Sequence, residues 1–317
     1  MRALITGING FVGSHLAERL LSNGCEVAGT IQPGTTLDNL AHLGQQARTM
    51  PCDVTDAAAV RDALTATKPD LIFHLAAVTF VPTSFASPRL TWQTNLFGTL
   101  NLYDALKALG ISPRILFVSS SDVYGRVRAE DLPITESAPL RPVSPYAASK
   151  AAADLASFEY AHDAGLDIVR VRPFNHTGPR QSPSFVCSDF ARQVARAERF
   201  AGEAVVRVGD IENKRDFTDV RDMVHAYWLA LAKGHRGEAY NLCSERAVKV
   251  ADVLDTLIRL SKRKIRVEKD AQRLRPTDIS TILGSSAKFR DATGWQPAIP
   301  LEKTLADLLD YWRGGLG

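Results

Sequence analysis

Short apolar runs alternate with amphipathic stretches along the first 175 residues of the chain. Five runs have the length of buried strands, at residues 2–6, 26–31, 70–75, 114–119 and 167–172. Between them, apolar residues recur at helical spacing over residues 14–22, 57–66, 92–108 and 146–162. This alternation predicts an α/β fold with a parallel sheet, and right-handed crossovers make it a doubly wound Rossmann sheet.

The pattern changes after Pro173. A polar loop (175–183), a helical stretch (185–199) and a glycine- and charge-rich stretch (208–222) precede further helices at residues 223–233, 251–261 and 301–313. We therefore expect two parts. Residues 1–175 form the Rossmann domain, to which later segments can return, and residues 176–317 form a smaller, irregular α/β lobe.

Composition narrows the class of protein. Hydrophobic residues make up 45% and charged residues 23%, which excludes disorder, collagen and coiled coil as the main architecture. The net charge of +3 is too balanced for a nucleic-acid or membrane partner. The four cysteines are widely spaced without a CxxC pair, so we expect no metal site and no disulfide framework. With no apolar stretch typical of a signal peptide, a cytoplasmic location is expected.

A glycine turn follows the first strand and opens the first helix. Gly7, Gly10 and Gly13 lie in the sequence TGINGFVG. Glycines let the backbone approach a pyrophosphate, and the helix N-terminus offers free N–H groups and a positive dipole end. The turn therefore predicts a dinucleotide site, the alternative being a tight structural turn.

The residues that usually anchor the adenosine ribose are absent. Residues 29–32 read Gly-Thr-Ile-Gln, with no acid for a ribose diol and no arginine for a 2′-phosphate. NADH and NADPH thus both remain open. NADPH is slightly favoured, because the acid that would repel its 2′-phosphate is absent from residues 29–32. Asp53 lies in the sequence Cys52-Asp53-Val54, at the end of a further strand expected before the helical stretch 57–66, where it either bonds the adenine amino group or caps the next helix.

Tyr146 and Lys150 stand four residues apart, on one face of a predicted helix. A nearby ammonium is expected to lower the pKa of the tyrosine, which then exchanges a proton with a sugar or ketone oxygen. The serine-rich segment 119–125 follows a strand, where a hydroxyl can bond the same oxygen. The pair alone is more typical of a solvated helix face, but the three features together in this order favour catalysis.

These motifs resemble those of a known family. TGINGFVG, HLAA (74–77), TNLFGT, SSSDVYG and YAASK are similar to the extended short-chain dehydrogenase/reductases that act on nucleotide sugars, over nearly the whole chain. The resemblance implies a catalytic triad of Ser120, Tyr146 and Lys150, with Ser119 and Ser121 as alternatives to Ser120. It implies a cofactor site made of Gly7, Gly10, Phe11, Val12, Gly13, Asp53, Val54, Leu75, Ala76, Ala77, Asn95, Tyr146, Lys150 and Pro173.

Motifs in the second half resemble the GDP-mannose branch of this family. RPFNHTGP (172–179), RDFTDVRD (215–222), LRPTD (274–278) and GWQP (294–297) are most similar to the reductases of GDP-4-keto-6-deoxymannose, which make GDP-D-rhamnose. The resemblance implies a GDP-linked 4-keto-6-deoxy sugar as substrate, reduced at C4 with NADPH or NADH. The residues implied to bind it are Ser121, Asp122, Asn175, Val186, Arg215, Arg275 and Asp278.

Other activities of the same family are the alternatives. The 4,6-dehydratases carry a glutamate where this chain has Asp122, which is one methylene shorter and disfavours dehydration. Epimerase-reductases use a Cys/His pair, and the matching positions here are Asp122 and Phe185. A non-catalytic, cofactor-sensing protein would be expected to have lost Tyr146 or Lys150. The resemblance also implies a homodimer in which helices 92–108 and 146–162 form a four-helix bundle, and His176 is expected to be a loop histidine.

Overall fold

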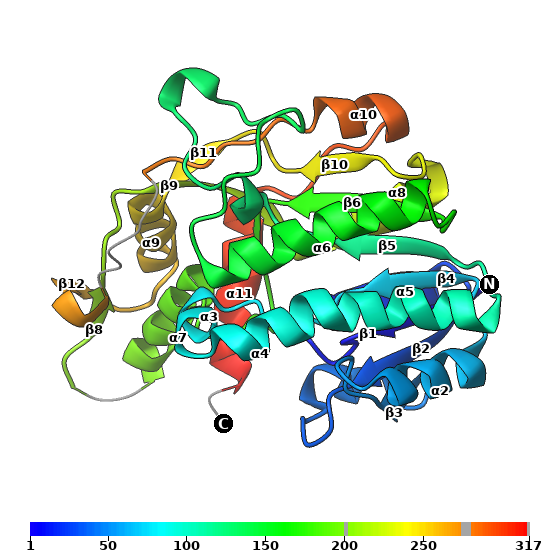
Figure 1. Ribbon diagram of the computed structural model, residues 1–317. Helices are drawn as coiled ribbons and strands as arrows, with labels where there is room; N and C mark the ends of the chain where they lie inside the picture. Colours follow the sequence, from blue (N-terminus) through cyan, green and yellow to red (C-terminus); the bar gives the residue numbers. More distant parts are fainter. Residues whose placement is uncertain (200–201, 274–279, 316–317) are drawn as a thin grey trace.

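A seven-stranded parallel sheet forms the centre of the molecule (Figure 1). The computed structural model describes residues 1–199, 202–273 and 280–315. In spatial order the strands are β10 (Ala239–Leu242), β6 (Ile168–Pro173), β5 (Arg114–Val118), β4 (Leu71–His74), β1 (Arg2–Thr6), β2 (Glu26–Ile31) and β3 (Ala47–Pro51). Every neighbouring pair is parallel, which confirms the α/β fold with a doubly wound Rossmann sheet.

Helices cover both faces of this sheet, because strands buried on two sides need two apolar partners. One face is covered by α2 (Ala57–Thr67), α5 (Gly98–Leu109) and α6 (Pro145–His162), whose apolar residues form one core with the sheet. The other is covered by α1 (Phe11–Ser22), α8 (Val220–Lys233) and α10 (Ala287–Thr293), which form a second core. The sheet therefore separates two cores, and its strand ends remain free to build a site.

The stretch expected to be one helix over residues 92–108 has three parts. They are α4 (Pro88–Trp92), a π-helical segment η2 (Gln93–Phe97) and α5, while α3 (Val81–Ala86) precedes them. The π-helical turn contains Asn95, whose side chain bonds the backbone of Val78 and the hydroxyl of Ser149. Periodicity alone does not reveal such a turn, since the apolar spacing continues across it.

A smaller lobe adjoins the carboxyl ends of the strands. A three-stranded sheet contains β7 (Asn175–Thr177), β9 (Lys214–Asp219) and β11 (Ala247–Lys249), and a two-stranded sheet pairs β8 (Val205–Val208) with β12 (Arg266–Lys269). Three helices share an apolar core with these strands: α7 (Val186–Arg199), α9 (Val250–Arg259) and α11 (Leu301–Gly315). Short 3-10 turns complete the structure: η1 (Asp38–Leu43), η3 (Ser121–Tyr124), η4 (Ala129–Asp131) and η5 (Ala271–Arg273).

Two stretches expected to be irregular contain strands. β7 lies within the predicted loop 175–183, and β9 lies within the charge-rich stretch 208–222. Both are short and polar, and they pair in parallel with each other across some 40 residues. Their strand conformation therefore depends on tertiary pairing, which local sequence does not show.

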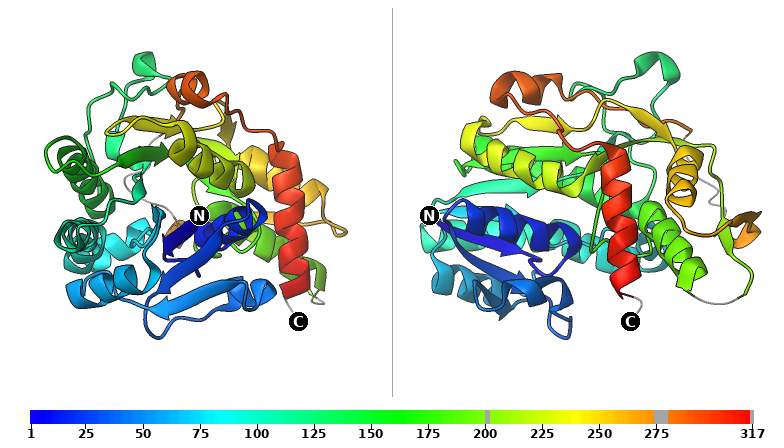
Figure 2. Two further views of the ribbon diagram at one scale, coloured as in Figure 1. Left: turned by 90° about the vertical axis from the view of Figure 1, so that its right-hand side faces the viewer. Right: turned by 180° about the vertical axis from the view of Figure 1, so that it is seen from behind.

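The chain crosses between the two parts more than once after residue 175. α8 and β10 come from the second half but belong to the Rossmann layers, where β10 pairs with β6. Figure 2 shows the C-terminal helix α11 running across the direction of the strands, and it packs on α7 of the lobe. Within the described ranges, no helix is long and apolar enough to cross a membrane.

Candidate active site

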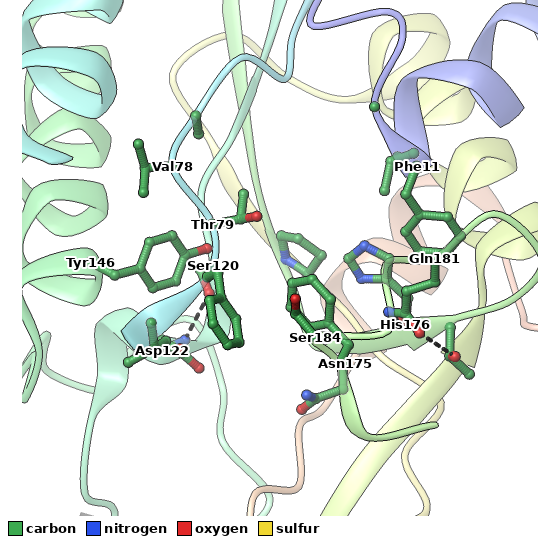
Figure 3. Close-up of a pocket in the computed structure, with 18 of the residues that line it drawn as sticks. Phe11, Val78, Thr79, Ser120, Asp122, Tyr146, Asn175, His176, Gln181 and Ser184 are labelled. Atoms are coloured by element: carbon green, nitrogen blue, oxygen red, sulfur yellow. Dashed lines mark hydrogen bonds between the residues drawn. The ribbon is translucent and has the colours of Figure 1, made fainter. Parts of the chain in front are cut away.

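A large cavity of about 1250 Å³ runs along the carboxyl ends of the central strands and continues into the lobe (Figure 3). β1 lies between β2 and β4, so the chain changes direction across the sheet there, and ligands bind at such switch points. The volume exceeds what a single drug-sized ligand fills. It is therefore large enough for a dinucleotide together with a second substrate.

The glycine turn forms one end of this cavity. Gly7 has a φ of +74°, and its N–H donates to the carbonyl of Thr30 at 2.9 Å, which joins the turn to β2. A Cβ on Gly13 would lie 2.4 Å from the carbonyl oxygen of Gly7, so no side chain fits there. The N-terminus of α1 thus comes close to the cavity with its N–H groups uncovered, an arrangement that fits a pyrophosphate.

A buried polar network holds the next strand end beside this turn. The hydroxyl of Thr6 accepts hydrogen bonds from the N–H groups of Leu75 and Ala76, both at 3.0 Å. His74 bonds the Thr6 hydroxyl with one ring nitrogen and the Thr99 hydroxyl with the other. Burial, with a further contribution from the Lys150 charge, lowers the pKa of His74 to about 3, so this histidine is neutral and structural.

The three residues of the predicted triad all line the cavity. Tyr146 stands in the first turn of α6, which Ser144 caps by accepting from the N–H of Ala147 at 3.1 Å. Figure 3 shows the hydroxyls of Tyr146 and Ser120 pointing toward one another. Lys150 lies one turn further along α6, with its ammonium 4.8 Å from the centre of the Phe117 ring. Helix α6 and the end of β5 therefore bring the triad together.

The electrostatics of the triad differ from the expectation for Tyr146. Burial and the Asp122 carboxyl raise the pKa of Tyr146 above its ordinary value, and the Ser120 hydroxyl opposes this only in part. The predicted lowering of this pKa by Lys150 is therefore wrong for the protein alone, because the loss of solvent around the hydroxyl has the largest effect. Burial also lowers the pKa of Lys150 to about 8. Tyr146 is thus a protonated acid at neutral pH.

Asp122 lies beside the triad. Its N–H donates to the Ser120 hydroxyl at 3.1 Å, which turns the short helix η3 against the end of β5. Burial raises the pKa of the Asp122 carboxyl, and the charge of Arg215 acts in the opposite direction. Arg215 comes from β9 of the lobe, so both parts of the molecule contribute charge to this point.

Asn95 does not line the cavity, unlike the other predicted residues that the structure describes. The side-chain oxygen of Asn95 accepts a hydrogen bond from the N–H of Val78 at 2.8 Å. The side-chain NH2 group donates to the Val78 carbonyl and to the Ser149 hydroxyl. The Ser149 hydroxyl donates in turn to the carbonyl of Tyr146. Asn95 thus links the loop after β4 to the helix that carries the triad, and its position is that of a supporting residue.

The adenosine end of the cavity is polar and has few charges. Asp53 lines it, and its carboxylate accepts from the N–H and the hydroxyl of Thr55. The helix-cap alternative for Asp53 is wrong, because Asp56 caps α2. Sequence reasoning missed Asn9 and Thr35, whose side chains bond each other at 2.9 Å in this wall. A hydroxyl and amide lining is chemically suited to ribose oxygens, and it does not choose between NADH and NADPH.

The substrate end lies between the Rossmann strands and the lobe. Asn175, Val186 and Arg215 line it as predicted, while Arg275 and Asp278 lie outside the described residues. Phe185, named above only in connection with the epimerase-reductases, also lines it. Sequence reasoning missed several further lining residues, for which only proximity in the fold is informative: Thr79, Phe80, Gln181, Ser184, Asp189, Arg192 and Arg273. Across the residues described, no group of His, Cys, Asp and Glu side chains is arranged to hold a metal ion.

His176 lines the boundary between the cofactor and substrate ends. Its ring stacks on that of Phe11 with centroids 6.1 Å apart, and Nδ1 lies 3.0 Å from the carbonyl oxygen of Phe174. Burial lowers the pKa of His176, so the neutral ring is favoured. These contacts fit a loop histidine that shapes the cavity wall.

Known proteins with this sequence pattern are nucleotide-sugar enzymes. Residues 4–308 match the family described as GDP-mannose 4,6 dehydratase. A GDP-6-deoxy-D-mannose reductase of Pseudomonas aeruginosa is 36% identical over 314 residues, covering 98% of this chain and 97% of that protein. A GDP-mannose 4,6 dehydratase of Arabidopsis thaliana is 30% identical over 325 residues, covering 97% of this chain and 88% of that protein.

Solved structures agree with these matches. The structure described as RMD from Pseudomonas aeruginosa complexed with NADPH has a TM-score of 0.86 and 36% identity, with 99% of both chains covered. A UDP-glucose 4-epimerase of Thermus thermophilus in complex with NAD has a TM-score of 0.88 and 31% identity, again over 99% of both chains. The family resemblance of the motifs is therefore confirmed, and the chain belongs to the GDP-mannose 4,6-dehydratase family of the extended short-chain dehydrogenase/reductases.

Proposed function

We propose that the protein reduces the C4 keto group of GDP-4-keto-6-deoxy-D-mannose to give GDP-D-rhamnose, with NADPH or NADH as reductant. The observation that carries the proposal is the meeting of Ser120, a protonated Tyr146 and Lys150 in the cavity that contains the glycine turn. The reductase that is 36% identical over nearly the full length supports the same reaction. NADPH is slightly favoured, since residues 29–32 at the end of β2 include no acid that would repel a 2′-phosphate.

The chain's own groups account for the proton in this reaction. Reducing a ketone to an alcohol requires a hydride at carbon, which the nicotinamide supplies when bound, and a proton at oxygen. The raised pKa of Tyr146 keeps its hydroxyl protonated, so it can donate that proton to O4. The Ser120 hydroxyl orients the oxygen, and the Lys150 ammonium, with a pKa of about 8, stabilises the tyrosinate that forms.

The GDP group would occupy the lobe end of the cavity. By family resemblance, Asn175, Val186 and Arg215 contact it together with Arg275 and Asp278. The charge of Arg215 suits a diphosphate, because a guanidinium donates in a planar fork to phosphate oxygens. The charge of Arg215 acts on Asp122, which supports an arrangement in which the sugar end of such a ligand lies beside the triad.

The test is the oxidation of the reduced cofactor. Adding GDP-4-keto-6-deoxymannose to the protein with NADPH or NADH should remove the reduced-nicotinamide absorbance. NMR of the product sugar then identifies the configuration at C4, since the rhamno and 6-deoxy-talo products differ only in the face of C4 that receives the hydride. If that substrate causes no oxidation of either cofactor, the proposed function is refuted.

A second candidate activity is dehydration of GDP-mannose. The Asp122 carboxyl, with its raised pKa, lies beside Tyr146 at the position where dehydratases carry their catalytic glutamate. Incubation with GDP-mannose and oxidised cofactor should yield no 4-keto product if Asp122 is too short for this role. Formation of the keto sugar at a rate comparable to its reduction would favour the dehydratase.

We also propose that the protein is a homodimer that pairs through α6. Leu155 and Phe158 of α6 are 59% and 44% exposed, and Leu90 and Phe97 on the adjoining α4 and η2 are 47% and 54% exposed. Large apolar side chains gathered on one face indicate an interaction surface. Light scattering should give a dimer mass for the wild type and a monomer mass for Leu155→Glu. A monomeric wild type would refute the pairing.

A further inference from the structure

Two aromatic side chains from opposite parts of the molecule meet in the wall of the cavity. Phe80 lies in the loop that leaves β4 and directly precedes α3, while Phe185 directly precedes α7 of the lobe. Their rings pack edge to face with centroids 5.9 Å apart, and both side chains line the cavity and are half-buried. Phe80 lies outside the family motifs described above, and Phe185 is named there only as a position that an epimerase-reductase would fill with a catalytic residue.

The backbone on both sides of this aromatic pair is fixed. Val78 lies two residues before Phe80, and the side-chain amide of Asn95 bonds both the N–H and the carbonyl of Val78. The N–H of Phe185 donates to the carbonyl of Ser182, and the Phe185 carbonyl accepts the N–H of Asp189 at 2.8 Å. The backbone that carries the two rings is therefore fixed, and the rings contact each other, before any ligand binds, which favours a selective subsite.

The pair stands at the reacting end of the cavity. Figure 3 shows Thr79 close to Ser120, and Ser184 across the cavity from them; these are the neighbours in sequence of Phe80 and Phe185. A sugar whose O4 reaches Tyr146 and Ser120 must place C6 in this same region, because only C5 separates C6 from C4.

We propose that Phe80 and Phe185 form the subsite for C6 of the sugar and select a 6-deoxy sugar, with its methyl group, over a 6-hydroxy sugar. The inference rests on the proposed function and specifies the substrate class within it. A methyl group gains from contact with two aromatic rings, whereas a hydroxyl that faces the rings loses water to atoms that offer no hydrogen bond. An apolar subsite of this kind discriminates against an added hydroxyl by on the order of ten- to a hundred-fold.

The subsite also bears on the choice between the two candidate activities. Dehydration removes the C6 hydroxyl, so a dehydratase must bind that hydroxyl and supply it with a proton. A reductase that acts after this step receives a methyl group at C6. An aromatic C6 subsite therefore favours the later reaction and disfavours GDP-mannose as substrate.

The experiment compares two ligands that differ only in the C6 hydroxyl. Binding of GDP-D-rhamnose (GDP-6-deoxy-D-mannose), of GDP-mannose and of GDP is measured by calorimetry. Excess NADPH is present, and since both sugars carry a hydroxyl rather than a keto group at C4, neither is reduced. The wild-type protein should bind the 6-deoxy sugar on the order of ten-fold more tightly than GDP-mannose. In Phe80→Asn and Phe185→Asn this ratio should fall toward one, and in Phe80→Leu and Phe185→Leu most of it should remain.

The controls separate the possible failures. GDP binding reports folding and the nucleotide site in every variant, and Phe85→Asn changes an exposed phenylalanine outside the cavity lining, so its ratio should match the wild type. Equal affinities of the two sugars for the wild-type protein overturn the inference without any variant. An unchanged ratio in both asparagine variants that still bind GDP also overturns it. Failure of the wild type to bind GDP refutes the proposed function itself, and the C6 subsite with it.

Discussion

Neutralising Asp154 should destabilise the fold strongly, because this carboxylate is the buried partner of two arginines. Asp154 on α6 is fully buried, and Arg170 and Arg172 on β6 have side chains only 8% and 7% exposed. The carboxylate accepts from the Nε of Arg172 at 2.9 Å, from its Nη2 at 3.1 Å, and from Nη1 of Arg170. Asp154→Asn keeps the shape and one acceptor but leaves two buried guanidinium groups without an opposing charge.

The size of the effect follows from this geometry. Removing one partner of a buried ion pair costs about 3–5 kcal/mol. Both arginines keep other acceptors, the carbonyl of Gly237 for Arg170 and the hydroxyl of Tyr124 for Arg172, so we expect about 3 kcal/mol, the lower end of that range. Against a total stability of about 5–15 kcal/mol, such a loss moves the urea midpoint far outside experimental error.

The destabilisation caused by Asp154→Asn should depend on pH. Burial alone would raise the pKa of Asp154, but the hydrogen bonds and charges of Arg172 and Arg170 lower it below its ordinary value. A lowered folded-state pKa means that the carboxylate stabilises the fold above its unfolded pKa of about 4 and loses that effect as pH falls through the folded value. The difference between wild type and Asp154→Asn should therefore be full at pH 7 and shrink in acid.

Urea unfolding followed by circular dichroism at pH 7 and in acid measures both effects. Asp163→Asn is the matched control, because Asp163 lies exposed at the C-terminus of the same helix and should leave the midpoint unchanged. Equal midpoints for the two variants at pH 7 would refute the reasoning. A difference that persisted undiminished in acid would refute the assignment to the charge of Asp154.

Three further outcomes are expected. Tyr146→Phe should lower turnover by on the order of a hundred-fold or more while NADPH affinity, followed by fluorescence, stays nearly unchanged; wild-type turnover would contradict its role as acid. Turnover should fall as pH rises through about 8, where Lys150 loses its charge, and a rate profile that is flat there would count against that role. Gly13→Ala should weaken NADPH binding, because its Cβ would lie 2.4 Å from the Gly7 carbonyl oxygen. In the control Gly314→Ala the added Cβ meets no neighbouring atom, so NADPH should bind normally. Equal NADPH affinities of the two variants would show that the turn tolerates a side chain.

The Rossmann half could be anticipated from the sequence because its signals are local. The period of the apolar residues indicates β1, β2, β4, β5 and β6 and the main helices between them, though not β3 or β10. The glycine turn and the Tyr146–Lys150 spacing are each complete within a few residues. The fold then brings these pieces to one strand edge, as a parallel sheet requires. What periodicity could not show is the π-helical turn at Asn95, which leaves the apolar spacing unbroken.

The lobe and the electrostatics were harder to anticipate because they depend on tertiary contacts. Strand β9 is polar and pairs with β7, so its conformation comes from its partner. Phe80 and Phe185 are more than 100 residues apart in the sequence, and only the fold makes them neighbours. The expected direction of the Tyr146 pKa was wrong for the same reason, since helical spacing to Lys150 says nothing about the loss of solvent around the hydroxyl.

The return of the chain to the large sheet has a consequence for its assembly. β10 covers the edge of β6, and α8 covers one face of it, yet both are made long after the cofactor half. A fragment ending at residue 175 would expose an unpaired strand edge together with buried valines at 169 and 171, the kind of surface that pairs with other chains and aggregates. The cofactor half is therefore not a portable module, and a cofactor-binding fragment must carry the chain through residue 242.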